Sequence, residues 1–274
     1  MDSEGALPPD LSAIEGTRHR YVACLFGPFK ILRDGDPLEQ ALSRASARTL
    51  LKWFLLNPGA RIEAADLCEL LWPSFRYSKN PNRLHVTLHY LRRLLEPGLA
   101  ARQSSAFIRT DGKRRYWFDP SGSWWTDVSE VERLFVAGKS AEVKGDTEAA
   151  IASYEDLLDY YDRTFLPENL FDEVFDSART AQDVAHRTAQ IRLLRLYLLR
   201  GLLHKALPCA LSVLDRDPYS EEAWTAIAEV SLLQGNILAA RTQLADYLDK
   251  VRRELRADPS PSALQLWERI RRAA

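Results

Sequence analysis

The sequence lacks the apolar segments of membrane proteins and the sequence motifs of many enzymes. Its three cysteines, Cys24, Cys68 and Cys209, lie far apart and match no metal or redox spacing. No apolar run approaches the ~18 residues that cross a bilayer. The glycine-rich phosphate loop, the dinucleotide-binding glycine motif and the zinc-protease motif are all missing. We therefore expect no membrane segment, no metal, no cofactor and no enzymatic activity.

The N-terminal segment 1–19 lacks both regular periodicity and an apolar core. It contains glycine, proline and acidic residues, a composition typical of a disordered tail. A secretory signal peptide needs an apolar stretch that this segment does not have. We therefore expect residues 1–19 to be disordered and the protein to be cytoplasmic, associated with nucleoid DNA when bound.

Charge is distributed unevenly along the chain, although its net value is only -1. Residues 20–124 hold 17 Lys/Arg against 9 Asp/Glu, a balance of +8, whereas residues 125–274 hold 19 against 25, a balance of -6. The whole-chain pI near 6.5 conceals this difference. An excess of basic residues in the first part is typical of a domain that binds a polyanion.

The segment 80–95 has the pattern of an amphipathic helix with one basic face. Its leucines recur at i, i+4, i+7 and i+11 and predict one buried stripe: Leu84, Leu88, Leu91 and Leu95. The other face carries polar and basic residues with no acid before Glu96: Arg83, His85, His89, Tyr90, Arg92 and Arg93. Ordinary surface helices mix charges of both signs. This pattern favours a DNA-facing helix, although a simply solvated face is the alternative.

A β-hairpin is predicted over residues 107–118. Asp111-Gly112 separates two runs of β-branched and aromatic residues, and three basic residues follow directly. Such a basic tip could contact DNA phosphates, or it could only keep an edge strand soluble. A basic helix followed by a basic hairpin favours a winged helix, with the helix in the major groove and the hairpin as the wing.

The pair His85 and His89 has the i, i+4 spacing with which two histidines can bind one metal ion. No third ligand is evident nearby, and arginines surround the pair. DNA contact or solvation is therefore the better interpretation.

Elements before and after this helix complete the predicted fold. Two short strands are expected around Gly27-Pro28, then helices over about 43–56 and 63–72. From Val128 onward the chain has helical patterns and no convincing strand. The expected fold is mainly α with a small β component: an N-terminal winged helix-turn-helix over residues 20–124 and an all-α domain over residues 125–274.

The second domain contains a spaced glycine pattern. Gly201 and Gly235 are separated by the tetratricopeptide period, and alanine occupies the fifth position after each of them. Asp217-Pro218 lies between them, where one helix pair would end. A similar copy begins at Gly145, farther from Gly201 than one period, so the repeat is irregular or is interrupted by an insertion. We expect the glycines to let paired helices cross closely. Unrelated helices with chance glycines are the alternative.

These segments together resemble a known family. The stretches LFGPFKILRDGDPL, ARTLLKWFLLNPGARIEAADLCELLWP, NRLHVTLHYLRRLLEP and IRTDGKRRYWFDP are similar to the OmpR-type winged helix of Streptomyces antibiotic regulatory proteins. The region from about Trp125 resembles the bacterial transcriptional activator domain that follows it in that family, as in DPYSEEAWTAIAEVSLLQGNILAARTQLADYLDKVRREL. Residues 157–179 match only approximately.

The resemblance implies a transcriptional activator that binds direct repeats in promoter double-stranded DNA, with two protomers side by side, and that contacts RNA polymerase. It also implies which residues face DNA: Asn82, Arg83, Val86, Thr87, His89, Tyr90 and Arg92 on the helix, and Lys113, Arg114 and Arg115 on the wing. Arg93, on the basic face of the same helix, completes the set of expected DNA contacts. Related domains often have arginine where Tyr90 stands, which puts its base contact in question.

Two other classes of function stay open. In one, the helical repeats bind a protein and the winged helix is only a scaffold. In the other, a groove in the repeats senses an unidentified ligand, since such a groove needs no motif. Salt-dependent DNA binding separates the first of these from a transcription regulator.

Overall fold

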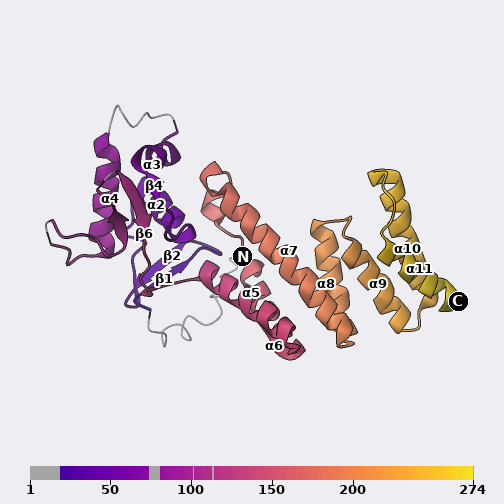
Figure 1. The fold of residues 1–274 in the computed structure, drawn as a ribbon. Coiled ribbons are helices and arrows are strands. Elements are labelled where there is room, and N and C mark those ends of the chain that lie inside the picture. Colours follow the sequence, from indigo (N-terminus) through magenta and orange to yellow (C-terminus); the bar gives the residue numbers. More distant parts are fainter. Residues whose placement is uncertain (1–18, 74–80, 101, 113, 274) are drawn as a thin grey trace, which may run out of the picture. The chain divides into compact units, whose positions relative to one another are not determined.

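The computed structural model describes residues 19–73, 81–100, 102–112 and 114–273. Apart from His19, the predicted tail lies outside this described part. The chain forms two compact units. The first comprises the described residues up to Glu132 together with Asp159–Ala181, and the second comprises Arg133–Leu158 with the described residues from Gln182 onward. Figure 1 shows the elements of both units.

A four-stranded sheet begins the first unit. Its strands are β1 (Tyr21–Cys24), β2 (Lys30–Arg33), β3 (Asp36–Pro37) and β7 (Trp124–Thr126), in the order β3-β2-β1-β7. β1 pairs with β2 antiparallel and with β7 parallel. The two strands around Gly27-Pro28 are confirmed, whereas β3 and β7 are too short to show a sequence pattern.

The winged helix follows. Its helices are α2 (Ala45–Leu56), α3 (Ala64–Leu71) and α4 (Pro81–Leu95), and its second sheet has the order β4 (Ile62–Glu63), β6 (Arg115–Phe118), β5 (Ile108–Thr110). β5 and β6 pair antiparallel, as predicted for the wing. The predicted leucine stripe of α4 is buried, with each side chain at most 1% exposed: Leu84, Leu88, Leu91 and Leu95.

Residues 159–181 also belong to the first unit, although they lie far along the chain. They contain three short 3-10 helices, η2 (Asp159–Asp162), η3 (Pro167–Asn169) and η4 (Glu173–Phe175). The Leu166 amide donates to the Leu25 carbonyl at 2.9 Å, and Leu166 and Phe175 are 1% exposed within the winged-helix core. The winged helix therefore shares its core with a segment beyond the boundary expected at residue 125.

Lys52 of α2 joins this segment to the winged helix. Its side chain is 1% exposed, and its Nζ donates to Glu168 at 2.7 Å and to Asn169 at 2.6 Å. The ammonium also lies 4.8 Å from the centre of the Phe29 ring. Burial lowers the pKa of Lys52, against the opposing effect of Glu168. The Lys52–Glu168 ion pair is thus a polar link within an otherwise apolar contact between α2 and residues 159–181.

Asp127 is a second buried polar link. One carboxylate oxygen accepts from the amides of Leu25 at 2.6 Å and Phe26 at 2.7 Å, and the other accepts from Val128 at 2.9 Å. Burial raises the pKa of Asp127 to about 7, although the backbone amides favour its charged form. Asp127 therefore satisfies two backbone amides that lie just beyond the end of β1.

The second unit is helical in its described residues, as predicted. It contains part of α5 (Asp127–Lys144), α6 (Thr147–Leu158), part of α7 (Asp176–Leu199), α8 (Leu203–Arg216), α9 (Glu221–Leu233), α10 (Ile237–Lys250), a π-helical turn (Val251–Leu255) and α11 (Pro261–Ala273). Helices neighbouring in sequence pack in pairs, α8 with α9, α9 with α10 and α10 with α11. The tetratricopeptide-like fold class is confirmed.

The repeat glycines have a different role from the one expected. Gly145, Gly201 and Gly235 end α5, α7 and α9 with φ of 76°, 66° and 79°, and a Cβ atom at any of them would meet nothing within 4 Å. The amide that follows each glycine bonds back to the carbonyl of the fifth residue before it, as in a Schellman cap. Backbone conformation requires these glycines, and the expected close crossing does not occur there. The alanine at the fifth position after each glycine is fully buried.

Candidate nucleic-acid interface

Helix α4 separates its side chains sharply into two faces. Opposite the buried leucines, six side chains are exposed: Asn82, Arg83, His85, Val86, His89 and Arg93. Val86, the apolar residue among these six, is 53% exposed. Asn82, Val86, His89 and Arg93 follow the helical spacing i, i+4, i+7, i+11 and form one continuous stripe. We call these four residues the outer stripe.

Three of the predicted DNA-facing residues are instead engaged within the protein. Thr87 is 4% exposed, and its hydroxyl donates to the Arg83 carbonyl at 3.0 Å. Arg92 is half-buried, and its Nε and Nη2 donate to the Ile108 carbonyl at 3.1 and 2.8 Å. Arg92 therefore joins α4 to the first wing strand. The structure does not place Thr87 or Arg92 with the outer stripe.

Tyr90 is the third of these residues. Its hydroxyl donates to the Ala41 carbonyl and accepts from the Ser43 amide at 3.2 Å, and the Arg44 guanidinium lies 4.7 Å from the ring centre. These contacts hold the segment before α2 against α4. The hydroxyl is therefore already occupied in the absence of DNA.

We expect Tyr90→Phe to leave the preferred DNA sequence unchanged and to lower the free energy of unfolding by about 1 kcal/mol, because the variant loses two hydrogen bonds and keeps the ring. Sequence selection and denaturant unfolding of the variant measure the two effects. A changed base preference without loss of stability would show that the hydroxyl contacts DNA.

The described basic residues at the tip of the wing, Arg114 and Arg115, differ in their surroundings. Arg114 is exposed in the connection between the strands, with φ of 75°. Arg115 begins β6 and forms an ion pair with Glu63 of β4 at 2.6 Å, which neutralises part of its charge. Lys113 lies outside the described residues. Of the wing residues described, Arg114 is the one placed best to meet a phosphate.

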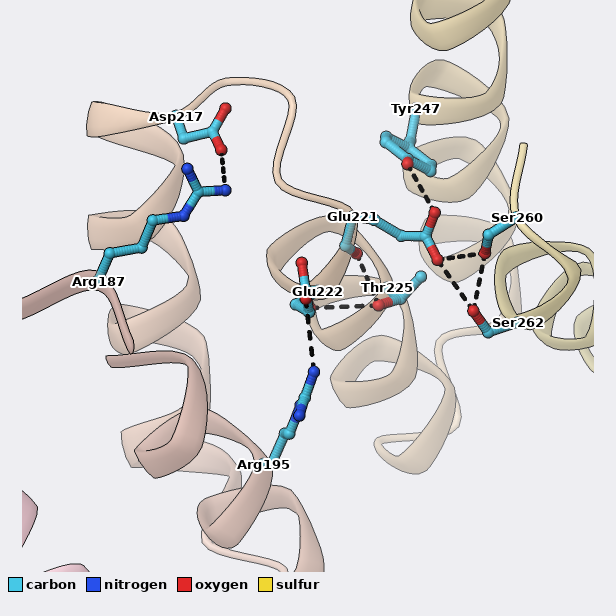
Figure 2. Close-up of polar contacts among 9 residues, drawn as sticks. All are labelled: Arg187, Arg195, Asp217, Glu221, Glu222, Thr225, Tyr247, Ser260 and Ser262. Carbon is cyan, nitrogen blue, oxygen red and sulfur yellow. Dashed lines mark hydrogen bonds and ion pairs between the residues drawn. The ribbon is translucent and has the colours of Figure 1, made fainter. Parts of the chain in front are cut away.

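Several polar side chains in the second unit pair with one another. On α7, Arg187 pairs with Asp217 and Arg195 pairs with Glu222 at 3.4 Å (Figure 2). The Glu221 carboxylate accepts from the hydroxyls of Tyr247 at 3.0 Å, Ser262 at 2.9 Å and Ser260. These contacts join helices α7 to α11 across the repeats. They form a structural network and no nucleophile–base arrangement.

An exposed apolar residue recurs beside each repeat glycine. Val143, Leu199 and Leu233 each lie two positions before a glycine, and they are 89%, 73% and 56% exposed. Leu238, just after Gly235, is 75% exposed. We call these four residues the turn leucines and valine. Sequence reasoning missed them, although an apolar residue at the same place before each glycine was the available signal.

Within the described part of the chain, no helix is long and apolar enough to cross a membrane. The same residues contain no group of three or more potential metal ligands, so His85 and His89 have no third ligand there.

Comparison with solved structures shows which folds this chain resembles. EmbR of Mycobacterium tuberculosis, solved with a low-affinity phosphopeptide, has a similar fold, with a TM-score of 0.78 and 20% identity over 92% of this chain. The chain spans 65% of EmbR. The TPR2B domain of yeast Sti1 matches 53% of the chain with 13% identity and a TM-score of 0.39. Comparison with curated sequences gives no match.

A family model, the bacterial transcriptional activator domain, matches residues 126–271. The order predicted from the sequence, a winged helix followed by this domain, is thus confirmed. Because the match covers more than half of the 274 residues, the chain belongs to the family of transcriptional regulators that carry a bacterial transcriptional activator domain.

Proposed function

We propose that the protein is a sequence-specific transcriptional activator that binds promoter DNA through α4 and the wing. The observation that carries this proposal is the sharp division of α4. Its leucines are buried, its opposite face is exposed, basic and free of acids, and the wing adds the exposed Arg114. An α-helix of this kind fits the major groove of B-DNA.

The outer stripe offers two kinds of contact. Arg93, together with Arg83 and Arg114, would neutralise phosphates and release counterions, so affinity should fall steeply with salt. Asn82 and His89 can donate hydrogen bonds to base edges, and the exposed Val86 can contact a thymine methyl group. Each good base contact contributes about 1–3 kcal/mol of discrimination. Phosphate contacts would position the protein, and these side chains would read the sequence.

One winged helix covers a short site, so specificity would come from two protomers on a direct repeat. The second unit would contact RNA polymerase. Support for a protein partner comes from the turn leucines and valine, which expose apolar surface at the same place in successive repeats. Contiguous exposed apolar patches mark protein interaction sites, whereas single exposed apolar residues are ordinary.

We expect Arg93→Gln with Arg114→Gln to weaken binding to all duplex DNA and to lower the slope of log affinity against log salt by about 2, because two phosphate contacts are lost. Fluorescence anisotropy at two or more salt concentrations measures the slope. Arg20→Gln with Lys30→Gln removes the same charge from residues outside α4 and the wing and is the matched control. An unchanged slope in the first variant would remove α4 and the wing from the interface.

We expect Leu199→Ser with Leu233→Ser to reduce activated transcription about tenfold while leaving DNA affinity unchanged, because apolar contacts to the polymerase would be lost. In vitro transcription with purified bacterial RNA polymerase measures activation. Val184→Ser is the control, since Val184 is 60% exposed in the same unit but lies beside no repeat glycine. Equal activation by both variants would argue against the turn leucines and valine as the polymerase contact.

A further inference from the structure

A pocket of about 590 Å³ lies in the first unit between the second half of α4, residues 102–106 and the wing strands β5 and β6. Its charged lining is entirely basic. Arg92 comes from α4, Arg102 from the connecting segment and Arg109 from β5, and no carboxylate residue lines it within the described chain. The remaining wall includes Ser104, Thr110 and Trp117, which add hydroxyl groups and an aromatic ring.

The segment that forms one wall is held in place by α4. The Glu96 carboxylate, at the end of that helix, accepts from the Ala106 amide at 2.8 Å and from the Ser105 hydroxyl. The Ser105 hydroxyl in turn accepts from the Ile108 amide at 3.0 Å, and the Gln103 side chain accepts from the Ala100 amide at 3.1 Å. The Glu96 carboxylate is therefore occupied by the segment itself, and the wall is formed before any ligand binds.

The three guanidinium groups keep donors for a ligand. Arg92 uses Nε and Nη2 on the Ile108 carbonyl, so its Nη1 has no hydrogen bond to the described residues. Arg102 is exposed and forms no ion pair there, whereas Arg109 shares its charge with Asp119 at 3.0 Å. Planar guanidinium groups match the oxygens of phosphate in paired hydrogen bonds. Three guanidinium groups around one pocket disfavour a neutral or cationic ligand.

We propose that this pocket binds a small phosphate-bearing molecule of about nucleotide size. Its volume lies within the roughly 300–1,000 Å³ of small-molecule sites. The pocket is lined by both α4 and β5, the elements that Arg92 already joins, so an occupant would brace the wing against the helix. A phosphate of the DNA backbone has the same chemistry, and the test must distinguish the two sources.

The experiment uses the full chain without DNA, with inorganic pyrophosphate and ATP as separate probes in isothermal titration calorimetry. We expect at least one probe to bind the wild type. Arg102→Gln should weaken that binding at least about tenfold, because a charge-assisted hydrogen bond is lost. The substitution keeps the Cβ atom, so the backbone at φ of 71° is equally strained in both proteins. Arg20→Gln, which removes the same charge from an exposed position of the same unit, should bind as the wild type does.

Absence of binding by both probes would overturn the proposal. Equal weakening by Arg102→Gln and Arg20→Gln would also overturn it, since binding would then reflect general charge. Affinity for duplex DNA, measured without either probe, provides the remaining test. If neither probe binds, a greater loss of DNA affinity in Arg102→Gln than in Arg20→Gln would assign the pocket to the DNA backbone, whereas specific probe binding with equal DNA affinity agrees with the proposal. The DNA-binding function itself is tested separately through Arg93 and Arg114.

Discussion

Lys52→Ala is expected to lower the free energy of unfolding of the first unit by about 3–5 kcal/mol. Removing the ammonium leaves the Glu168 carboxylate and the Asn169 amide without their shared partner and opens a cavity beside Phe29. Because Glu168 is 39% exposed and can regain water, the lower end of this range is the better expectation. Without the Lys52 ammonium, residues 159–181 should detach from the winged helix.

Tryptophan fluorescence during denaturant unfolding of the full chain measures this change, because five of the seven tryptophans precede residue 133. A double-mutant cycle with Glu168→Gln separates the free energy of the Lys52–Glu168 ion pair from the cost of the cavity. If the cycle gives no coupling between the two positions, the ion pair does not hold the segment. Lys144→Ala, an exposed lysine of the second unit, is the control and should change stability by less than about 0.5 kcal/mol.

Asp127→Ala is expected to cost about 2–5 kcal/mol, because the amides of Leu25 and Phe26 would remain buried without an acceptor. Asp127→Asn keeps an acceptor oxygen and should cost much less. Alanine and asparagine variants of equal stability would show that the two amides find another partner, most directly water.

The pH dependence of Asp127 gives an independent check. Its pKa of about 7 in the folded protein lies above the ordinary value of 3.8, so between these pH values the folded state holds a proton that the unfolded state has released. The stabilisation that this bound proton provides is complete below about pH 4 and is lost as pH rises to about 7. Asp127→Asn should therefore gain about 2–3 kcal/mol relative to the wild type between about pH 5 and pH 8. A stability difference between Asp127→Asn and the wild type that does not change with pH would contradict the raised pKa of Asp127.

Patterns that repeat within one element were predictable from the sequence. The leucine spacing predicted α4 and its buried face, and Asp111-Gly112 between two apolar runs predicted the wing. Both depend on contacts between residues close in sequence, where helical and strand periodicity act directly. The repeat glycines were also located correctly, although sequence alone could not distinguish a close crossing from the left-handed backbone that ends each helix.

Features assembled from distant segments were not predictable. Leu166 and Phe175 complete the winged-helix core from a part of the sequence far beyond β1, and no local pattern records such a contact. The roles of Tyr90 and Arg92 depend on Ala41 and Ile108, which periodicity does not place beside them. The basic pocket likewise needs α4, the following segment and the wing together. Helical spacing shows which face a residue occupies and leaves its partner undetermined.

The outer stripe of α4 is central to the proposed function, because it would read promoter DNA. Selection of bound sequences from random duplex DNA with the full chain, repeated with His89→Ala, tests this role most directly. We predict a direct repeat with half-sites roughly 10–11 base pairs apart, and relaxed preference at a few positions of each half-site in the variant. No enriched sequence, together with salt-independent affinity, would contradict the account and make the winged helix a scaffold for the helical repeats.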